Sequence, residues 1–320
     1  MGSLDEARSL LESGDFAGAV QAIGELLERH PENSDLMSGF YAASYWEHRQ
    51  ALLTQAPAGK LSGAYLLDEW NAFESLLRDK KLDLTPSVDS AMRAVLNHAA
   101  RQFRHRFKEG SVGTEDVAAL LQLSRNMMRL RDYRNARDLL GFALQLQPHR
   151  PETMMLLGEC RALVGDEEKD ALEYEKGLGT MRDAFLLNNA PLDVQAYRSS
   201  PASEIVGELN FRFSGEEKER VALWLPAEWM TAVLDHPHLR RLQSDEILQI
   251  EEECMRLERD LPTLDDRYRE KAAARLCFYS LVLLHSLYHH YDNEARRDEL
   301  ITLIGRLRPG LLNRSRLSEN

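Results

Sequence analysis

Residues 14–31 read GDFAGAVQAIGELLERHP, and residues 131–148 read RDYRNARDLLGFALQLQP. Aligned without a gap, the two stretches share six features: Asp15 and Asp132, Phe16 and Tyr133, Ala19 and Ala136, Ile23 and Leu140, Leu26 and Ala143, and Pro31 and Pro148. The intervals from the aromatic residue to the last apolar residue are three, four and three, which place these side chains on one helix face. The proline ends that helix. The recurrence predicts a repeated helical unit.

Each of these helices needs a partner helix to cover its apolar face. Residues 116–129 precede the second stretch, and residues 152–164 follow it; both carry an apolar stripe of helical period. Ser124 and Gly158 each stand directly after a leucine in these two segments. A small residue at that position allows a second helix backbone to approach closely, so we expect helix hairpins.

This pattern resembles the tetratricopeptide repeat, whose first helix carries a leucine followed by a small residue and whose second helix begins with G-D-Y/F-x-x-A. Residues 117–150 match best, 151–166 supply a next first helix, and 5–33 match most of another repeat. Residues 34–46 fit a further first helix, but Tyr41 stands where the small residue is usual, so the packing there must differ. The resemblance implies an all-α solenoid of stacked hairpins.

The chain divides into three regions on these grounds. Residues 1–110 are expected to hold repeat-like helices with an inserted helix over 61–80, and residues 111–190 the core hairpins. Residues 191–320 lack the repeat and predict a C-terminal helical bundle or cap. The predicted fold is therefore an all-α, tetratricopeptide-like solenoid with irregular inserted helices and this C-terminal helical domain.

Local signals predict further elements. Thr85 and Pro86 form a cap and first-turn pair that opens a helix to about Lys108. Residues 209–213 alternate apolar and polar side chains, which predicts one short strand. Further helices are expected after a capping box at 214–217, after Leu225, after a Ser244 cap, from Thr263 to about His290, and over 294–307.

The composition restricts the class of partner. The 320 residues carry a formal net charge of −12, which disfavours nucleic acid because phosphate backbones are anionic. No run of eighteen apolar residues occurs, so no membrane span is expected. The start, residues 1–6, shows no leader pattern, and three dispersed cysteines suggest no disulfide framework. We therefore expect the protein to lie in the cytoplasm. The alternative is that a secretion signal or membrane anchor has been removed from the sequence.

Three motifs suggest chemistry, and each has a simpler explanation. Residues 58–62 lack the spacing of a phosphate-binding loop. His285 and His289 share a helix face that suits a metal, but no third ligand accompanies them, and histidines also suit the end of a helix. The basic and aromatic segment 101–108 suits an acidic partner or an anionic surface, or simply complements a helix dipole. We therefore expect no enzyme, no cofactor and no bound metal.

The inner groove of such a solenoid is lined by the first helix of each hairpin. The resemblance places five side chains in it: Tyr45, Trp46, Arg125, Arg129 and Glu159. The lysine and asparagine clamp that this family uses for C-terminal carboxylates is absent, because its positions hold Leu121 and Arg125, then Met155 and Glu159. The groove instead suits an acidic and apolar peptide. Alternatively, Tyr45 and Trp46 pack under the helix at 61–80.

The leading hypothesis is a scaffold or adaptor that assembles a multiprotein complex. Bacterial tetratricopeptide proteins of this kind occur in motor, secretion and envelope assemblies, which is an implication of the resemblance. A regulatory protein that binds a small ligand in its C-terminal domain is the alternative, and a metal-dependent enzyme is a third. The partners would be proteins or peptide segments, and the aromatic C-terminal third suits self-association.

Overall fold

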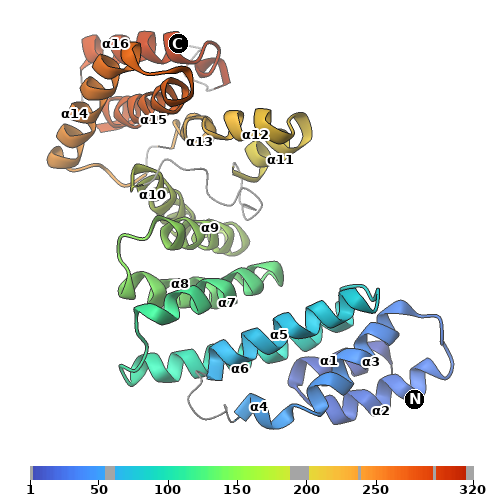
Figure 1. The fold of residues 1–320 in the computed structure, drawn as a ribbon. Coiled ribbons are helices and arrows are strands. Elements are labelled where there is room, and N and C mark those ends of the chain that lie inside the picture. Colours follow the sequence, from blue (N-terminus) through green and yellow to red (C-terminus); the bar gives the residue numbers. More distant parts are fainter. Residues whose placement is uncertain (1–2, 55–61, 188–201, 237–238, 291–292, 315–320) are drawn as a thin grey trace. The chain divides into compact units, whose positions relative to one another are not determined.

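The computed structural model describes residues 3–54, 62–187, 202–236, 239–290 and 293–314 (Figure 1). These residues form sixteen α-helices, three short 3-10 helices and no strand. The predicted all-α class is therefore confirmed. The chain forms two compact units, Met1–Pro148 and His149–Asn320. The boundary between the units falls inside the predicted region 111–190 and coincides with neither predicted boundary, so the three regions stay a prediction.

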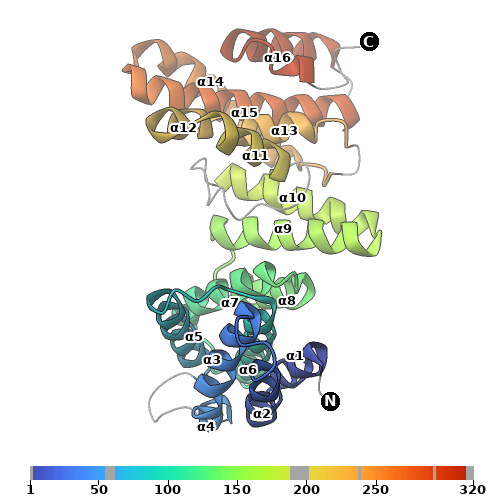
Figure 2. The same ribbon diagram turned by 90° about the vertical axis from the view of Figure 1, so that its right-hand side faces the viewer.

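The first unit contains α1 (Leu4–Ser13), α2 (Phe16–Leu27), α3 (Ser34–Glu47), α4 (Gln50–Thr54), α5 (Ser62–Asp79), α6 (Pro86–Lys108), η1 (Thr114–Asp116), α7 (Val117–Arg129) and α8 (Tyr133–Leu146). Within it, α1 packs on α2, α2 on α3, and α7 on α8. The long helix α6 contacts α1, α3 and α5 extensively (Figure 2). The predicted helices at 61–80 and from Pro86 to Lys108 are confirmed.

The aspartate that the two repeated stretches share begins the second helix of each hairpin. Asp15 accepts a hydrogen bond from the backbone N–H of Gly18 at 3.0 Å. Asp132 accepts one from Asn135 at 3.4 Å. Both satisfy a backbone donor that the first turn of a helix leaves unpaired. The repeated aspartate is therefore an N-cap.

The small residue that α3 needs is Gly39, and the alignment that put Tyr41 there was wrong. A Cβ on Gly39 would lie 2.8 Å from the Cβ of Ser87 on α6, so only glycine fits. Tyr41 instead points outward, with its ring beneath the Lys80 ammonium. Helices α4 and α5 stand between α3 and α6 in the chain. Gly39 of α3 makes its close approach with α6.

The second unit contains α9 (Pro151–Glu168), α10 (Ala171–Leu187), α11 (Ala202–Arg212), α12 (Gly215–Ala222), α13 (Leu225–Ala232), α14 (Ser244–Asp260), η2 (Leu261–Thr263), α15 (Asp266–His290), α16 (Glu294–Leu307) and η3 (Leu312–Arg314). Residues 276–286 of α15 are all buried, and α13, α14 and α16 contact this helix. A helix that is apolar all round is covered on every side. The start expected for α13, the end expected for α15 and both bounds expected for α16 are confirmed, whereas α15 begins at Asp266, three residues after the expected Thr263.

Four local expectations for this unit were wrong. Residues 209–213 are not a strand: residues 209–212 form the end of α11 and Phe213 follows it, because an amphipathic helix buries Leu209 equally well. Ser214 precedes α12 without a side-chain cap bond. Gln243, not Ser244, caps α14 through a bond with Glu246. The helix expected to end near Asp166 continues to Glu168, where Lys169 turns left-handed.

The hairpin of α9 and α10 is held by direct backbone contact. A Cβ on Gly177 would lie 2.5 Å from the backbone nitrogen of Ala162 and 2.7 Å from the carbonyl oxygen of Gly158. A Cβ on Gly158 would lie 2.8 Å from the carbonyl oxygen of Gly177. The predicted role of Gly158 as the small residue of a first helix is confirmed, and Gly177 provides the facing position.

Candidate functional site

The face of α1 and α3 that should form the groove is covered by the chain itself. The helix α6 packs on both, with Met92, Val95 and Phe103 among its buried side chains. The inserted helix α5 packs on α3 and α6 and buries Trp70 and Phe73 completely. Each large apolar side chain contributes roughly 1.5–3 kcal/mol when buried. This covering is therefore part of the stable core.

Trp46 lies inside that core, and no partner can reach it while the helices stay packed. Its side chain is 0% exposed, and its ring stacks on Trp70 with centroids 6.0 Å apart. Tyr45 is half-buried, 4.9 Å from the Phe73 ring, and its hydroxyl donates to the Glu69 carboxylate at 3.2 Å. Both residues therefore pack under α5, as the alternative interpretation of the sequence predicted.

Charged residues also contribute to the contact between α3 and α5. Arg49 places its guanidinium 3.7 Å from the centre of the Tyr45 ring and donates to Glu69 at 3.1 Å. Burial is the main cause that raises the pKa of Tyr45, and the Glu69 carboxylate adds to it. Tyr45 is therefore a neutral hydrogen-bond donor near neutral pH. The cluster links two helices and exposes little surface for binding.

The two predicted groove arginines lie on α7, both half-buried. Arg129 donates to the Glu74 carboxylate of α5 at 2.9 Å, and Glu74 also accepts from the Trp70 indole at 2.9 Å. The structure therefore connects Trp46, through Trp70 and Glu74, with Arg129. Arg125, one turn earlier, also takes part in an interaction. Arg129 holds α5 in place, which is a structural role.

Glu159 belongs to the other compact unit and is 0% exposed in α9. Its charge helps raise the pKa of Tyr174 on α10, an effect caused first by burial of the phenol. A buried carboxylate does not line an open groove, so its predicted position there was wrong. The periodicity placed Glu159 on the correct helix, but the close approach of α10 covers that face.

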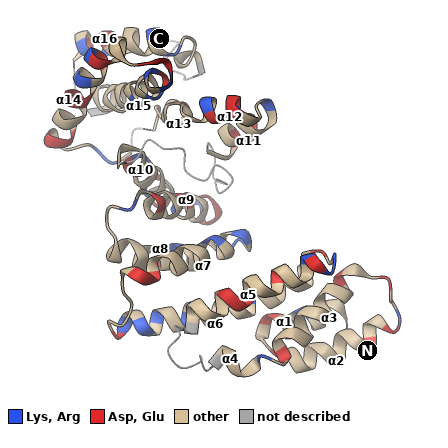
Figure 3. Ribbon diagram, in the orientation of Figure 1, with Lys and Arg blue, Asp and Glu red and all other residues tan. Residues whose placement is uncertain are grey.

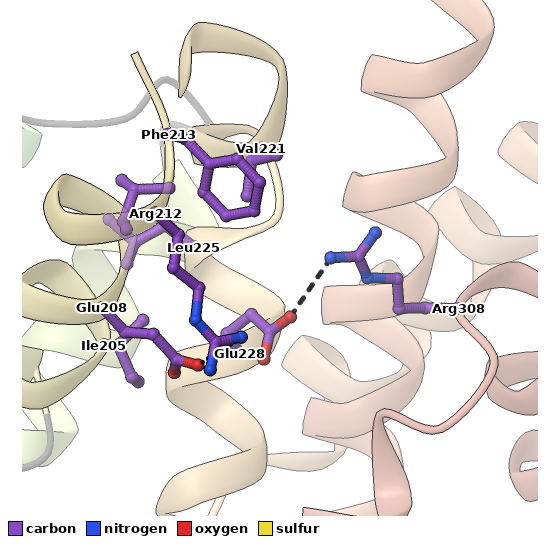
Figure 4. A pocket seen from close by; sticks show the side chains of 9 residues that line it. Ile205, Glu208, Arg212, Phe213, Val221, Leu225, Glu228 and Arg308 are labelled. Atoms are coloured by element: carbon purple, nitrogen blue, oxygen red, sulfur yellow. Dashed lines mark hydrogen bonds and ion pairs between the residues drawn. The ribbon is translucent and has the colours of Figure 1, made fainter. Parts of the chain in front are cut away.

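An open pocket in the second unit has the features of a binding surface (Figure 4). Its volume is about 90 Å³, and it lies among α11, α12, α13 and the end of α16. The apolar lining comes from Ile205, Leu209, Phe213, Val221 and Leu225. The space is about that of one side chain. The sequence does not predict this pocket, because the alternation of apolar and polar side chains at 209–213 indicates a strand.

Two ion pairs border this pocket. Arg212 contacts Glu208 at 2.9 Å within α11, and Arg308 reaches from beyond α16 to Glu228 at 3.5 Å (Figure 4). The Arg308 guanidinium also lies 5.0 Å from the Trp224 ring centre. Phe211 belongs to α11, the helix that supplies Ile205, Glu208, Leu209 and Arg212 to the lining, and its side chain is 91% exposed. An apolar centre with a charged rim is the usual anatomy of a protein interface.

The two histidines considered for metal binding both face backbone carbonyls. The Nε2 atom of His285 lies 2.9 Å from the carbonyl oxygen of His236, and that of His289 lies 2.9 Å from the carbonyl oxygen of Leu234. They hold the segment after α13 against α15. In the part of the chain that the structure describes, no three histidine, cysteine or acidic side chains gather as metal ligands would.

Among the described helices, none combines the length and hydrophobicity that crossing a bilayer requires. Comparison with curated proteins and with solved structures finds no match. A family model for the tetratricopeptide repeat matches residues 4–52, and no family is assigned to the rest. A domain of this family implies binding to other proteins. Residues 4–52, which form α1, α2, α3 and the beginning of α4, are a tetratricopeptide repeat segment.

Proposed function

We propose that this protein is a non-catalytic adaptor, that the pocket lined by α11 receives an apolar side chain of a partner protein, and that Phe211 on the same helix contacts that partner. The single observation that carries the location is the almost complete exposure of Phe211 on α11, the helix that also lines a preformed apolar pocket. Isolated exposed apolar residues are common, but an exposed phenylalanine on a helix that also lines an apolar pocket with a charged rim is typical of a contact surface.

The repeat segment supports the class of function, and its packing argues against the usual groove. The inner face of α1 and α3 is filled by α5 and α6. A partner would have to displace Trp70, Phe73 and their neighbours to enter, at a cost of several kcal/mol. The repeat segment therefore serves as a rigid platform, and a surface outside its groove carries the partner.

Site-specific photo-crosslinking tests this proposal. A photoreactive amino acid replaces Phe211 in one variant and Leu172 in the control, since Leu172 is 60% exposed in the same unit. In native extract we expect a discrete protein adduct at position 211 and none at 172. Equal labelling at both positions, or no adduct at 211, contradicts the proposal.

Untagged competitors sharpen the result. Excess Phe211→Ser protein should fail to suppress the adduct, whereas excess Leu172→Ser protein should suppress it as well as wild type. Mass spectrometry of the adduct then identifies the partner. The resemblance supports a finer proposal, in which the protein lies in the cytoplasm and belongs to a bacterial motor, secretion or envelope assembly. The identity of the crosslinked partner tests it.

A second candidate function is small-ligand binding in the C-terminal domain. A pocket of about 510 Å³ between α15 and α16 favours it, and Leu284, Tyr288, Ile301 and Leu312 provide its apolar lining. Arg297 and Arg308 also line it, which suits an apolar anion. Calorimetry with decanoate tests this: heat of binding that Ile301→Trp abolishes supports the site, and no heat with wild type rejects it.

A further inference from the structure

The C-terminal half of α6 carries the densest positive charge in this acidic chain. Arg101, Arg104, Arg106 and Lys108 lie within eight residues, although acidic residues outnumber basic ones by 52 to 40 overall. Figure 3 shows these cations together at one end of α6. A cluster of one sign on a protein of the opposite net charge creates a local field that attracts anionic groups.

These cations are not neutralised inside the described part of the chain. Arg101 donates to the carbonyl of Asn97 at 3.3 Å, Arg104 to the side-chain oxygen of Asn135, and Arg106 to the carbonyl of Ser111. Those acceptors are neutral. Within the described residues, none of the four cations has a carboxylate within ion-pair distance. Their charge is therefore available to an external partner.

The helix dipole explains only part of the cluster. His105, Arg106 and Lys108 occupy the last turn of α6, where cations complement the partial negative charge of the helix end. Arg101 and Arg104 lie before that turn, and the dipole effect falls off within one turn. A second reason is needed for these two arginines.

Arg101 and Arg104 line a pocket of about 320 Å³ where α6 meets the end of α1. Ser13, Asn97 and His98 add hydrogen-bonding groups to its wall, and Glu12 is the carboxylate among the lining residues. Burial, and then the Arg101 charge, lowers the pKa of His98, so the imidazole is neutral near neutral pH. Two guanidiniums against one carboxylate leave the pocket cationic.

We infer that this pocket and the adjoining cations of α6 form a docking site for an acidic segment of a partner protein. Carboxylate side chains would pair with Arg101 and Arg104, while the Asn97 amide donates hydrogen bonds. A peptide fits better than a flat surface because the charges line a concave site on one helix. The inference rests on the proposed adaptor function and supplies a second interface, in a different unit from Phe211.

Fluorescence anisotropy with a labelled peptide of alternating glutamate and serine tests the site. We expect binding to wild type that weakens steadily as salt rises, because the contacts are ionic. The same peptide with glutamine in place of glutamate should bind at least tenfold more weakly. The variant Arg101→Gln/Arg104→Gln should lose at least tenfold in affinity for the glutamate peptide.

The matched control is Arg267→Gln/Lys271→Gln, which removes the same charge from exposed positions at the start of α15. It should bind like wild type; equal losses in both variants mean non-specific attraction and overturn the inference. Since Arg104 bonds Asn135, Arg101→Gln/Lys108→Gln serves as the second variant if the first fails to fold.

Two further titrations distinguish an acidic protein segment from other anionic partners. Vesicles of phosphatidylserine and a single-stranded oligonucleotide are titrated under the same conditions. Tighter binding of either, lost in the Arg101→Gln/Arg104→Gln variant, overturns the assignment to an acidic protein segment. Loss of peptide binding here leaves the Phe211 crosslink unchanged, and failure of that crosslink does not alter this titration, so the two proposals fail separately.

Discussion

The Asp35 carboxylate on α3 accepts two hydrogen bonds from Ser87 at the start of α6, one from its backbone N–H and one from its hydroxyl, both at 2.9 Å. Arg8 on α1 donates to the same carboxylate at 2.7 Å. One side chain thus caps the first turn of α6 at Ser87, 52 residues later in the chain, and ties this helix to the first repeat hairpin. This contact fixes α6 over the groove face.

Asp35→Asn should lower the free energy of unfolding by about 1–3 kcal/mol, because it leaves the helix start and Arg8 without their anionic partner. Urea unfolding monitored by circular dichroism measures the change. Asp5→Asn is the control, since Asp5 is exposed and meets Arg8 only at 3.7 Å. Equal effects of the two substitutions would show that the interhelical cap contributes nothing specific.

The Asp35 cap should also appear in the pH dependence of stability. Burial raises the pKa of Asp35, but hydrogen bonds from Thr85, Ser87 and Arg8 outweigh it, so the pKa lies below the ordinary value of 3.8. A lowered pKa gives stability that is complete above that value and is lost as pH falls through the folded-state pKa. The advantage of wild type over Asp35→Asn should therefore be constant near neutral pH and shrink in acid. A constant advantage in acid would contradict this.

Amide hydrogen exchange decides whether α5 ever leaves the groove. Five large side chains of α5 are buried: Leu66, Leu67, Trp70, Phe73 and Leu77. Together they are worth about 10 kcal/mol, similar to the stability of a whole domain. We expect the amides of α5 to exchange as slowly as those of α6. Faster exchange across α5 alone would mean that the groove opens locally and that Tyr45 and Trp46 become accessible.

Gly177→Ala should destabilise the second unit by about 3 kcal/mol, because the new methyl group would collide with the backbone of α9. Gly305→Ala in α16 is the matched control, since no atom lies within 4 Å of its Cβ position. That substitution should stabilise by roughly 0.5–1 kcal/mol, through lower entropy of the unfolded chain. Urea unfolding compares the two, and a destabilised Gly305→Ala would contradict the packing argument.

The three cysteines should not react with thiol reagents in the native protein at mildly alkaline pH. Cys160, Cys254 and Cys277 are buried, and burial raises the pKa of Cys254 and of Cys277 to about 12. Because the thiolate is the nucleophile, both access and ionisation oppose reaction. Absorbance of released thionitrobenzoate measures it, with Ser111→Cys as an exposed positive control. Rapid native labelling of more than the introduced thiol would contradict the burial.

Local sequence signals determined most of the helices. The starts at Pro86 and Pro151 and the repeated caps Asp15 and Asp132 depend on residues within about one turn. The interval of three and four between apolar positions also acts locally, so it predicted the long helices of both units. The same argument failed at 209–213, because five residues are too few to separate a strand period from a helix period.

Whether the groove face is open or covered was decided only by the tertiary structure. Periodicity placed Trp46 and Glu159 on their helices correctly but could not show that α5 and α10 cover those faces. The pocket lined by α11 likewise needs α16 to bring Arg308 to Glu228, 80 residues earlier. Helix formation depends on neighbours along the chain, whereas the covering of a face depends on distant segments. The sequence therefore determined the helices and the repeat, and long-range packing decided which of their surfaces remain open.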